Sequence, residues 1–177
     1  MKPKFYPSDD NPLWNDEVER VLPWMEGKGL DVGAGGRSPL AEMVRVDIDP
    51  KNEPDHVAPM EKLPFPDASF DYCYAGHTLE HSKSPTTALK EFVRVVKLGG
   101  YILLIVPDRE YTATYLTKRQ DTGGNPYMTH YFETNLEEFR DFLKDHTNLE
   151  YTIIDCGVAG QNWSNYAVLR KQITPSQ

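Results

Sequence analysis

Two short segments near the start of the chain combine residue types that suit the binding of a nucleoside. Gly29-Leu-Asp-Val-Gly-Ala-Gly-Gly36 passes from a short apolar run into a glycine turn, and Val46-Asp-Ile-Asp-Pro50 ends a second apolar run on carboxylates. Glycines allow the backbone of a turn to approach a ligand closely, and an acid at the end of the next strand accepts hydrogen bonds from both ribose hydroxyls. The two segments therefore predict a nucleoside-binding crevice at one edge of a parallel sheet.

Two later residues are candidates for proton transfer. His77 follows the apolar run Phe70–Ala75, and Asp108 follows the run Tyr101–Val106. Ligands of open α/β sheets bind beyond the carboxyl ends of the strands, so both side chains are expected to face the crevice. His77 is then a candidate general base or acceptor-orienting group, with packing or cofactor contact as the alternative. The alternative for Asp108 is to cap a following turn.

Metal binding is not expected from the histidines and cysteines. His77 and His81 are four residues apart, so a helix would place them on one face, but His-Thr-Leu-Glu-His lacks the Glu-second order of the His-Glu-x-x-His zinc motif. Cys73 and Cys156 have no metal-ligand spacing and are expected to be buried, reduced thiols. We therefore predict a structural role for His81 and no metal site.

The elements that must position these residues alternate between strands and helices. Helices are expected after Asn15, where Pro23 would shorten the helix, after Ser84-Pro85 as far as Gly99-Gly100, and after a capping box at Thr134–Glu137. Strands are expected at Leu30–Val32, Val44–Ile48, His56–Ala58, Phe70–Ala75, Tyr101–Val106, Leu149–Ile154 and Tyr166–Leu169. This alternation predicts an α/β, doubly wound, mostly parallel sheet whose last two strands pair antiparallel. Residues 1–177 are expected to form one domain, with an irregular lead-in at 1–14 and an acceptor-side loop at 109–131. Within that loop, Glu110, Tyr111 and His130 are candidates to line the acceptor side.

The composition excludes several classes of partner. The 177 residues include 19 basic and 27 acidic side chains, a net charge of −8, and no basic stripe, so a nucleic-acid partner is not expected. No apolar run is long enough to span a bilayer, and the N-terminus has no apolar core of a signal peptide. A cytoplasmic protein is the corresponding expectation.

With the elements in order, the chain resembles the class I S-adenosylmethionine-dependent methyltransferases, in the form with a short first helix. The resemblance rests on segments from Leu30-Asp-Val-Gly-Ala-Gly35 to Val106-Pro-Asp108, including Leu63-Pro-Phe-Pro-Asp-Ala-Ser-Phe-Asp71, His77-Thr-Leu-Glu-His81 and Glu91-Phe-Val-Arg-Val-Val-Lys-Leu-Gly-Gly100. It implies a Rossmann-like, seven-stranded sheet and S-adenosyl-L-methionine as the cofactor.

The resemblance also implies roles for individual residues. Gly33, Ala34 and Gly35 would pass beneath the methionine part of the cofactor, and Asp31 would help to hold its ammonium group. Asp47, with Ile48 beside it, would accept the ribose hydroxyls. Met60 and Glu61 would flank the adenine, and Ala75, Gly76 and His77 would border the sulfonium. Because the cofactor is cationic, carboxylates suit this site better than the helix N-terminus that holds a pyrophosphate.

Two departures from the family pattern stand out. Eleven residues, 33–43, connect the first two strands, which is barely enough for a parallel crossover and leaves room for only a truncated first helix. Pro59 stands where many relatives have an aspartate that contacts the adenine amine. The resemblance therefore implies adenine recognition by Met60, Glu61 and backbone groups.

The hypothesis that follows is methyl transfer to a small-molecule, lipid or glycan-type acceptor by direct in-line displacement. A catalytically silent, methyltransferase-like binding domain is the alternative that Pro59 and the short connection suggest. A nicotinamide-binding domain is a third, but Ser38 stands where the Gly-x-Gly-x-x-Gly fingerprint requires its last glycine.

Overall fold

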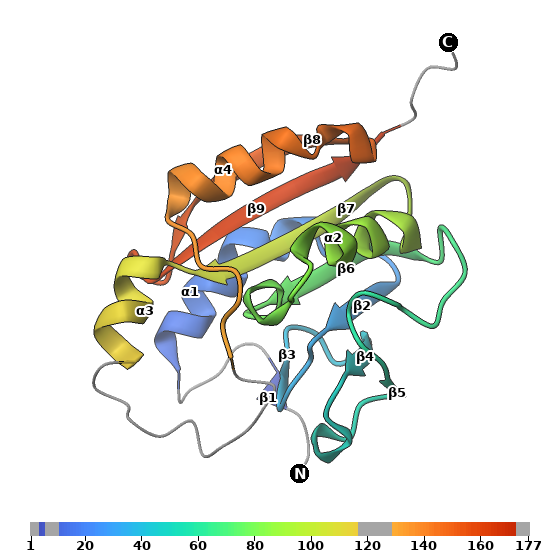
Figure 1. The fold of residues 1–177 in the computed structure, drawn as a ribbon. Coiled ribbons are helices and arrows are strands. Elements are labelled where there is room, and N and C mark those ends of the chain that lie inside the picture. Colours follow the sequence, from blue (N-terminus) through green and yellow to red (C-terminus); the bar gives the residue numbers. More distant parts are fainter. Residues whose placement is uncertain (1–3, 6–10, 117–128, 173–177) are drawn as a thin grey trace.

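A mixed seven-stranded sheet forms the centre of the fold (Figure 1). The computed structural model describes residues 4–5, 11–116 and 129–172. The strand order is β5-β4-β2-β6-β7-β9-β8, and β9 alone runs against its neighbours. The strands are β2 Gly29–Val32, β4 Val44–Asp47, β5 His56–Val57, β6 Phe70–Gly76, β7 Val96–Pro107, β8 Tyr151–Ala159 and β9 Ser164–Lys171. The predicted doubly wound, mostly parallel sheet with an antiparallel last strand is confirmed.

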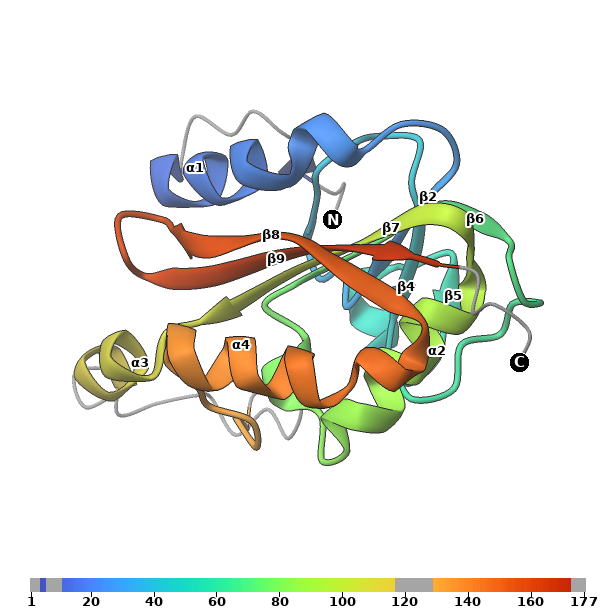
Figure 2. The same cartoon turned by 90° about the horizontal axis from the view of Figure 1, so that it is seen from above.

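Helices cover both faces of this sheet, as Figure 2 shows. The helix α1, Pro12–Val21, lies on one face, and α2, Pro85–Val95, and α4, Leu136–Asp145, lie on the other. None of the helices in the described part of the chain is long and apolar enough to cross a membrane.

The central strand β7 explains why two separate cores form. Its run from Ile102 to Val106 is buried throughout. Because successive side chains of a strand point to opposite faces, Ile102 and Leu104 enter the core beneath α2 and α4, whereas Leu103 and Ile105 enter the core beneath α1.

The connection between β2 and β4 differs from the prediction. Residues 33–43 contain no helix at all, so the expected truncated first helix is wrong. Pro39 disfavours helical geometry for Ser38, which instead extends into a two-residue strand, β3 Arg37–Ser38. This strand pairs in parallel with β1, Lys4–Phe5, and only the five residues 39–43 remain before β4. The connection from β2 to β4 is therefore made without a helix.

Several boundaries are also corrected. The helix α1 starts at Pro12, inside the lead-in expected to be irregular, and Asn11 rather than Asn15 caps it by accepting from Trp14 N at 3.1 Å. The loop expected at 109–131 begins instead as the helix α3, Arg109–Leu116, and residues 117–128 lie outside the described part.

Two helix ends further along the chain lie a few residues from their expected places. The capping box of α4 is Asn135 with Glu138, one residue later than predicted. The helix α2 ends at Val95 and passes directly into β7, so the Gly99-Gly100 pair lies within the strand rather than stopping the helix. Both errors are local and leave the predicted order of elements unchanged.

Candidate active site

The glycine turn after β2 lies at the point where the strand order reverses, between β2 and β6. Gly33 and Gly35 have left-handed backbones with φ of 70° and 49°, and the N–H of Gly33 donates to Val46 O at 2.8 Å. A side chain on Gly33 would collide with Thr78, whereas no atom lies within 4 Å of a Cβ built on Gly36. The turn is therefore packed against Thr78, just after β6, on one side and open on the other, as a backbone cradle for a ligand requires.

Asp47, at the end of β4, holds this turn from the side. Its Oδ2 accepts from Gly35 N at 2.7 Å and its Oδ1 accepts from Asp49 N at 2.8 Å. Each carboxylate oxygen has a second lone pair that can accept a ligand hydroxyl. Asp49, the other acid of the segment, caps the next turn by accepting from Lys51 N at 3.0 Å. The two acids thus have different partners: Asp47 bonds to the glycine turn, and Asp49 bonds to the turn that follows β4.

Asp31 lies within the sheet beside the turn and is only 1% exposed. Burial raises the pKa of its carboxyl to about 7, although a 2.5 Å hydrogen bond from Ser38 Oγ and the charge of Arg45 act in the opposite direction. A cationic group next to this carboxyl would favour its charged form. Asp31 is thus a polar group whose charge depends on what lies beside it.

Arg45 is a residue of the site that the motifs did not indicate. Its guanidinium is nearly buried and donates to the carbonyl oxygens of Gly35 at 2.8 Å, Asn52 at 3.0 Å and Glu53 at 2.9 Å. It therefore ties the glycine turn to the connection after β4. The available signal was a single cation inside an apolar strand, a position that usually requires partners when it is buried.

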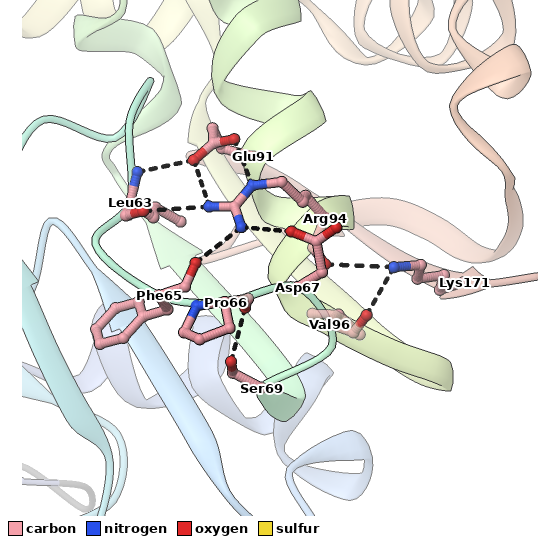
Figure 3. Close-up of polar contacts among 9 residues, drawn as sticks. All are labelled: Leu63, Phe65, Pro66, Asp67, Ser69, Glu91, Arg94, Val96 and Lys171. Atoms are coloured by element: carbon pink, nitrogen blue, oxygen red, sulfur yellow. Dashed lines mark hydrogen bonds and ion pairs between the residues drawn. The ribbon is translucent and has the colours of Figure 1, made fainter.

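Arg94 of α2 fixes the segment that begins at Leu63, two residues after Glu61 (Figure 3). Arg94 donates to the carbonyl oxygens of Leu63 at 3.1 Å and Phe65 at 2.8 Å and pairs with Glu91, which itself accepts from Leu63 N at 2.8 Å. Glu61 accepts from Ser82 Oγ at 2.5 Å. Hydrogen bonds thus join two motifs of the resemblance, one on this loop and one on α2.

At the end of β6, Ala75 is buried and Gly76 is tightly packed against Tyr74. His77 follows with a left-handed φ of 52°, and its N–H donates to Ile105 O at 2.8 Å. Because His77 precedes the 3₁₀ turn Leu79–His81 in this conformation, His77 and His81 do not share a helix face as their spacing predicted.

The imidazole of His77 lies between two nearly buried carboxylates. Its Nε2 is 3.0 Å from Glu17 Oε1 and its Nδ1 is 3.7 Å from Glu80 Oε1. Burial disfavours the charged ring, but Glu17 and Glu80 outweigh that effect and raise the pKa of His77 to about 9. Near neutral pH the ring therefore carries a proton and acts as a hydrogen-bond donor.

Glu17 belongs to the same cluster and was not found from the sequence. It lies on the inner face of α1 with Val18 and Val21, is 2% exposed, and also accepts from Ser164 Oγ of β9. Its signal was a carboxylate at a core-facing position of an amphipathic helix, where an acid is costly unless it is paired.

Asp108 lies at the end of β7 and begins α3. Its Oδ1 accepts from Glu110 N at 2.9 Å, as in the predicted capping role, and its Oδ2 accepts from Asn165 Nδ2 at 3.2 Å. Trp163, after β8, connects the two candidate side chains: its carbonyl accepts from Asp108 N at 2.8 Å, and its ring centroid is 5.9 Å from that of His77. The ring of Tyr111 lies 4.8 Å from the same indole. His77 and Asp108 therefore line one wall at the carboxyl ends of neighbouring strands.

His130, which the sequence suggested for the acceptor side, lies next to His81. Its ring packs against His81, with centroids 5.0 Å apart, beneath the turn that carries Glu80. Burial lowers the pKa of both histidines below the ordinary value. Both rings are therefore neutral near pH 7, in contrast to His77.

Comparison with known proteins shows similarity to methyltransferases over part of this chain. Residues 30–104 match the sequence model of the family described as a methyltransferase domain. The chain is 30% identical over 117 residues to an uncharacterized protein of Methanocaldococcus jannaschii, which covers 58% of this chain and 56% of that protein. It is 39% identical over 59 residues to the ubiquinone/menaquinone biosynthesis C-methyltransferase UbiE of Laribacter hongkongensis, covering 33% of this chain and 24% of that enzyme. The chain thus spans little more than half the length of the first relative and about a quarter of the second.

A solved structure resembles the fold over nearly the whole chain. It is a chain from the complex between the Haloferax volcanii Trm112 methyltransferase activator and a methyltransferase, with a TM-score of 0.69, 12% identity, and coverage of 93% of this chain and 92% of that one. Residues 30–104 therefore match a methyltransferase domain in sequence, and the fold is similar over nearly the whole chain to that solved structure, in agreement with the resemblance drawn from the motifs. The class I methyltransferases that the motifs resemble use S-adenosylmethionine as their cofactor.

The described residues fit that cofactor. The open glycine turn suits close approach of the methionine part, the Asp47 carboxylate retains acceptor capacity for a ribose, and Asp31 is a buried acid that a nearby ammonium would stabilise in its charged form. Pro59 offers no side-chain acceptor for an adenine amine, and its carbonyl is used by Lys62 N at 3.1 Å. Ile48 is 44% exposed beside Asp47 and offers an apolar surface instead.

Proposed function

We propose that this protein transfers the methyl group of S-adenosylmethionine to a small-molecule, lipid or glycan-type acceptor by direct in-line displacement. The observation that carries the proposal is the Asp47 carboxylate bonded to Gly35 N in the open glycine turn. When bound, the cofactor supplies an electrophilic methyl on a cationic sulfur. The protein's contribution is to bring the two reactants together and orient them, which can lower a barrier by about 7–11 kcal/mol.

We assign the cofactor roles to the residues that the motifs indicated. Gly33, Ala34 and Gly35 form the cradle, and Asp31 takes the ammonium group. Asp47 takes the ribose, with Ile48, Met60 and Glu61 around the base. Ala75, Gly76 and His77 border the sulfonium. The two nearly buried carboxylates beside His77, Glu17 and Glu80, favour the binding of a cationic cofactor and disfavour that of a polyanionic acceptor.

The two candidate catalytic side chains take different roles in this proposal. His77 carries a proton near neutral pH, so it orients an acceptor oxygen by donating a hydrogen bond rather than by removing a proton. Asp108 is an acceptor at the end of the neighbouring strand and is the better base for a hydroxyl acceptor. The acceptor proton then goes to Asp108 Oδ as the new bond to the methyl carbon forms and the carbon–sulfur bond breaks.

The first test is calorimetric titration of the full chain with S-adenosylhomocysteine. We expect one site per chain, and folded protein that shows no binding at hundreds of micromolar would contradict the proposal. A second test incubates the protein with methyl-labelled S-adenosylmethionine and panels of phenolic, lipid and glycan acceptors. Label should appear in one panel, and nucleic acid serves as the negative panel.

A catalytically silent domain that binds a partner is the second candidate. Pro59 and the absence of a helix between β2 and β4 favour it, because both remove elements that many relatives use around the cofactor. Folded protein that ignores the cofactor but co-purifies with a partner would support this alternative over methyl transfer.

A further inference from the structure

Three side chains to which the proposed reaction assigns no contact with a reactant converge at the turn after β6. Glu80 and His81 lie in the 3₁₀ turn after β6, and His130 comes from the segment that precedes α4. One ligand atom from each lies within 4.8 Å of the other two. The spacing of His81 and His130 along the chain did not indicate this cluster.

Two polar atoms of the cluster are buried without a hydrogen-bond partner in the described part of the chain. They are Glu80 Oε2, in a residue that is 1% exposed, and His130 Nδ1. His130 Nδ1 lies 3.5 Å from Glu133 Oε1, which is too long for a good hydrogen bond. Buried polar atoms are almost always paired in proteins, so these two indicate a missing ligand.

The surroundings hold the three groups in an orientation that suits metal binding. His81 Nδ1 lies 3.1 Å from the carbonyl of Thr129. In a neutral imidazole, Nδ1 therefore carries the proton and donates a hydrogen bond to that carbonyl. The lone pair is then on Nε2, which is 3.8 Å from Glu80 Oε1. A backbone carbonyl that fixes the tautomer of a ligating histidine is the usual second shell of a metal site.

The backbone also fixes the segment that brings His130 to the turn. The N–H groups of Tyr131 and Phe132 both donate to the carbonyl of Glu80, at 2.7 and 3.1 Å. The cluster is therefore assembled by hydrogen bonds that exist without a metal, and only small side-chain movements are needed. Ligand atoms around a tetrahedral zinc are about 3.4 Å apart, given bonds of about 2.1 Å.

We propose that Glu80, His81 and His130 bind one divalent transition-metal ion, with zinc as the best match. Two imidazoles and one carboxylate are a ligand set of catalytic zinc and of other divalent first-row metals, whereas magnesium and calcium prefer oxygen ligands. Three protein ligands leave a position open for an oxygen ligand. Since Glu80 Oε1 also lies 3.7 Å from His77 Nδ1, that position adjoins the wall formed by His77 and Asp108, and an acceptor oxygen is its expected occupant; this last part rests on the proposed function.

Metal titration of the chelator-treated full chain tests the proposal. We expect calorimetry to give one zinc per chain and cobalt to give the visible absorption of a low-coordinate site. His130→Gln and His81→Gln should each weaken zinc binding at least tenfold and remove that absorption. His56→Gln, a change of an exposed histidine on β5, is the matched control and should leave both unchanged. Glu80→Gln, nearly identical in shape, tests the carboxylate separately.

The proposal would be overturned if the wild type bound zinc no more tightly than the His81 and His130 variants do. It would also be overturned if the His56 variant lost as much zinc affinity as they do. Far-ultraviolet circular dichroism verifies that each variant is folded. S-adenosylhomocysteine is titrated into the metal-free protein in a separate experiment. Failure of the metal site and failure of the cofactor site are therefore seen independently.

Discussion

Replacing Asp47 and Asp49 one at a time tests the geometry of the cofactor site most directly, because the two acids are neighbours in sequence and differ in direction. Asp47 accepts from Gly35 N in the glycine turn, whereas Asp49 accepts from Lys51 N and faces the following turn. A hydrogen bond to a charged group contributes about 1.5–3 kcal/mol. Two ribose hydroxyls on Asp47 therefore contribute about 3 kcal/mol or more, which corresponds to a change on the order of 100-fold in Kd.

Calorimetric titration with S-adenosylhomocysteine measures this difference. Asp47→Ala should weaken binding on the order of 100-fold, and Asp49→Ala should stay within about twofold because it loses only the cap of a short turn. Thermal unfolding without ligand verifies that both variants are folded. An equal loss in the two variants, or a loss of less than fivefold in folded Asp47→Ala, would refute the assignment of the ribose to Asp47.

Three further predictions concern the groups around the site. Asp31 has a folded pKa of about 7, above its unfolded value, so its contribution to stability is complete in acid and is lost as pH rises to about 7. Urea titrations of Asp31→Asn and of the wild type at pH 4 and pH 8 measure this loss. Between these two pH values the stability of the variant relative to the wild type should increase by about 4 kcal/mol. A difference in unfolding free energy that does not change with pH would contradict the prediction. Gly33→Ala places a side chain on a left-handed backbone and against Thr78, so it should lower the free energy of unfolding in urea by about 1–3 kcal/mol. Gly36→Ala should be nearly neutral. Equal effects of the two substitutions would refute the packing argument. Arg94→Met should lower the free energy of unfolding by about 2 kcal/mol and weaken S-adenosylhomocysteine binding, because it releases the loop that follows Met60 and Glu61. Arg140→Met removes one exposed hydrogen bond and is the control, which should change neither quantity.

Much of the fold was predictable because its signals are local. The alternation of short apolar runs with amphipathic segments predicted the seven strands and their directions, and glycines and prolines marked most of the turns. The errors are local as well: the capping residue of α4 is one position later than predicted, and Ser38-Pro39 favours a strand where spacing allowed a short helix. Each of these involves a competition between neighbouring residues with small differences in free energy.

The site was predictable only where residues lie in one motif. Gly33, Gly35 and Asp47 are brought together by two adjacent strands, so their spacing was informative. Glu17, Arg45 and Trp163 have no motif, and they reach the site through contacts between elements distant in sequence. A pattern along the chain does not encode such contacts.

The sequence by itself determined the fold class and the edge of the sheet where a cofactor is expected to bind, because strand order and glycine turns follow from local periodicity and backbone sterics. Only the tertiary structure decided that Asp47 bonds to the glycine turn itself, through Gly35 N. It also decided that His77 is held between two carboxylates and that His130 meets Glu80 and His81. The physical reason is that side-chain direction and charge state depend on groups that folding brings within a few ångströms from elsewhere in the chain.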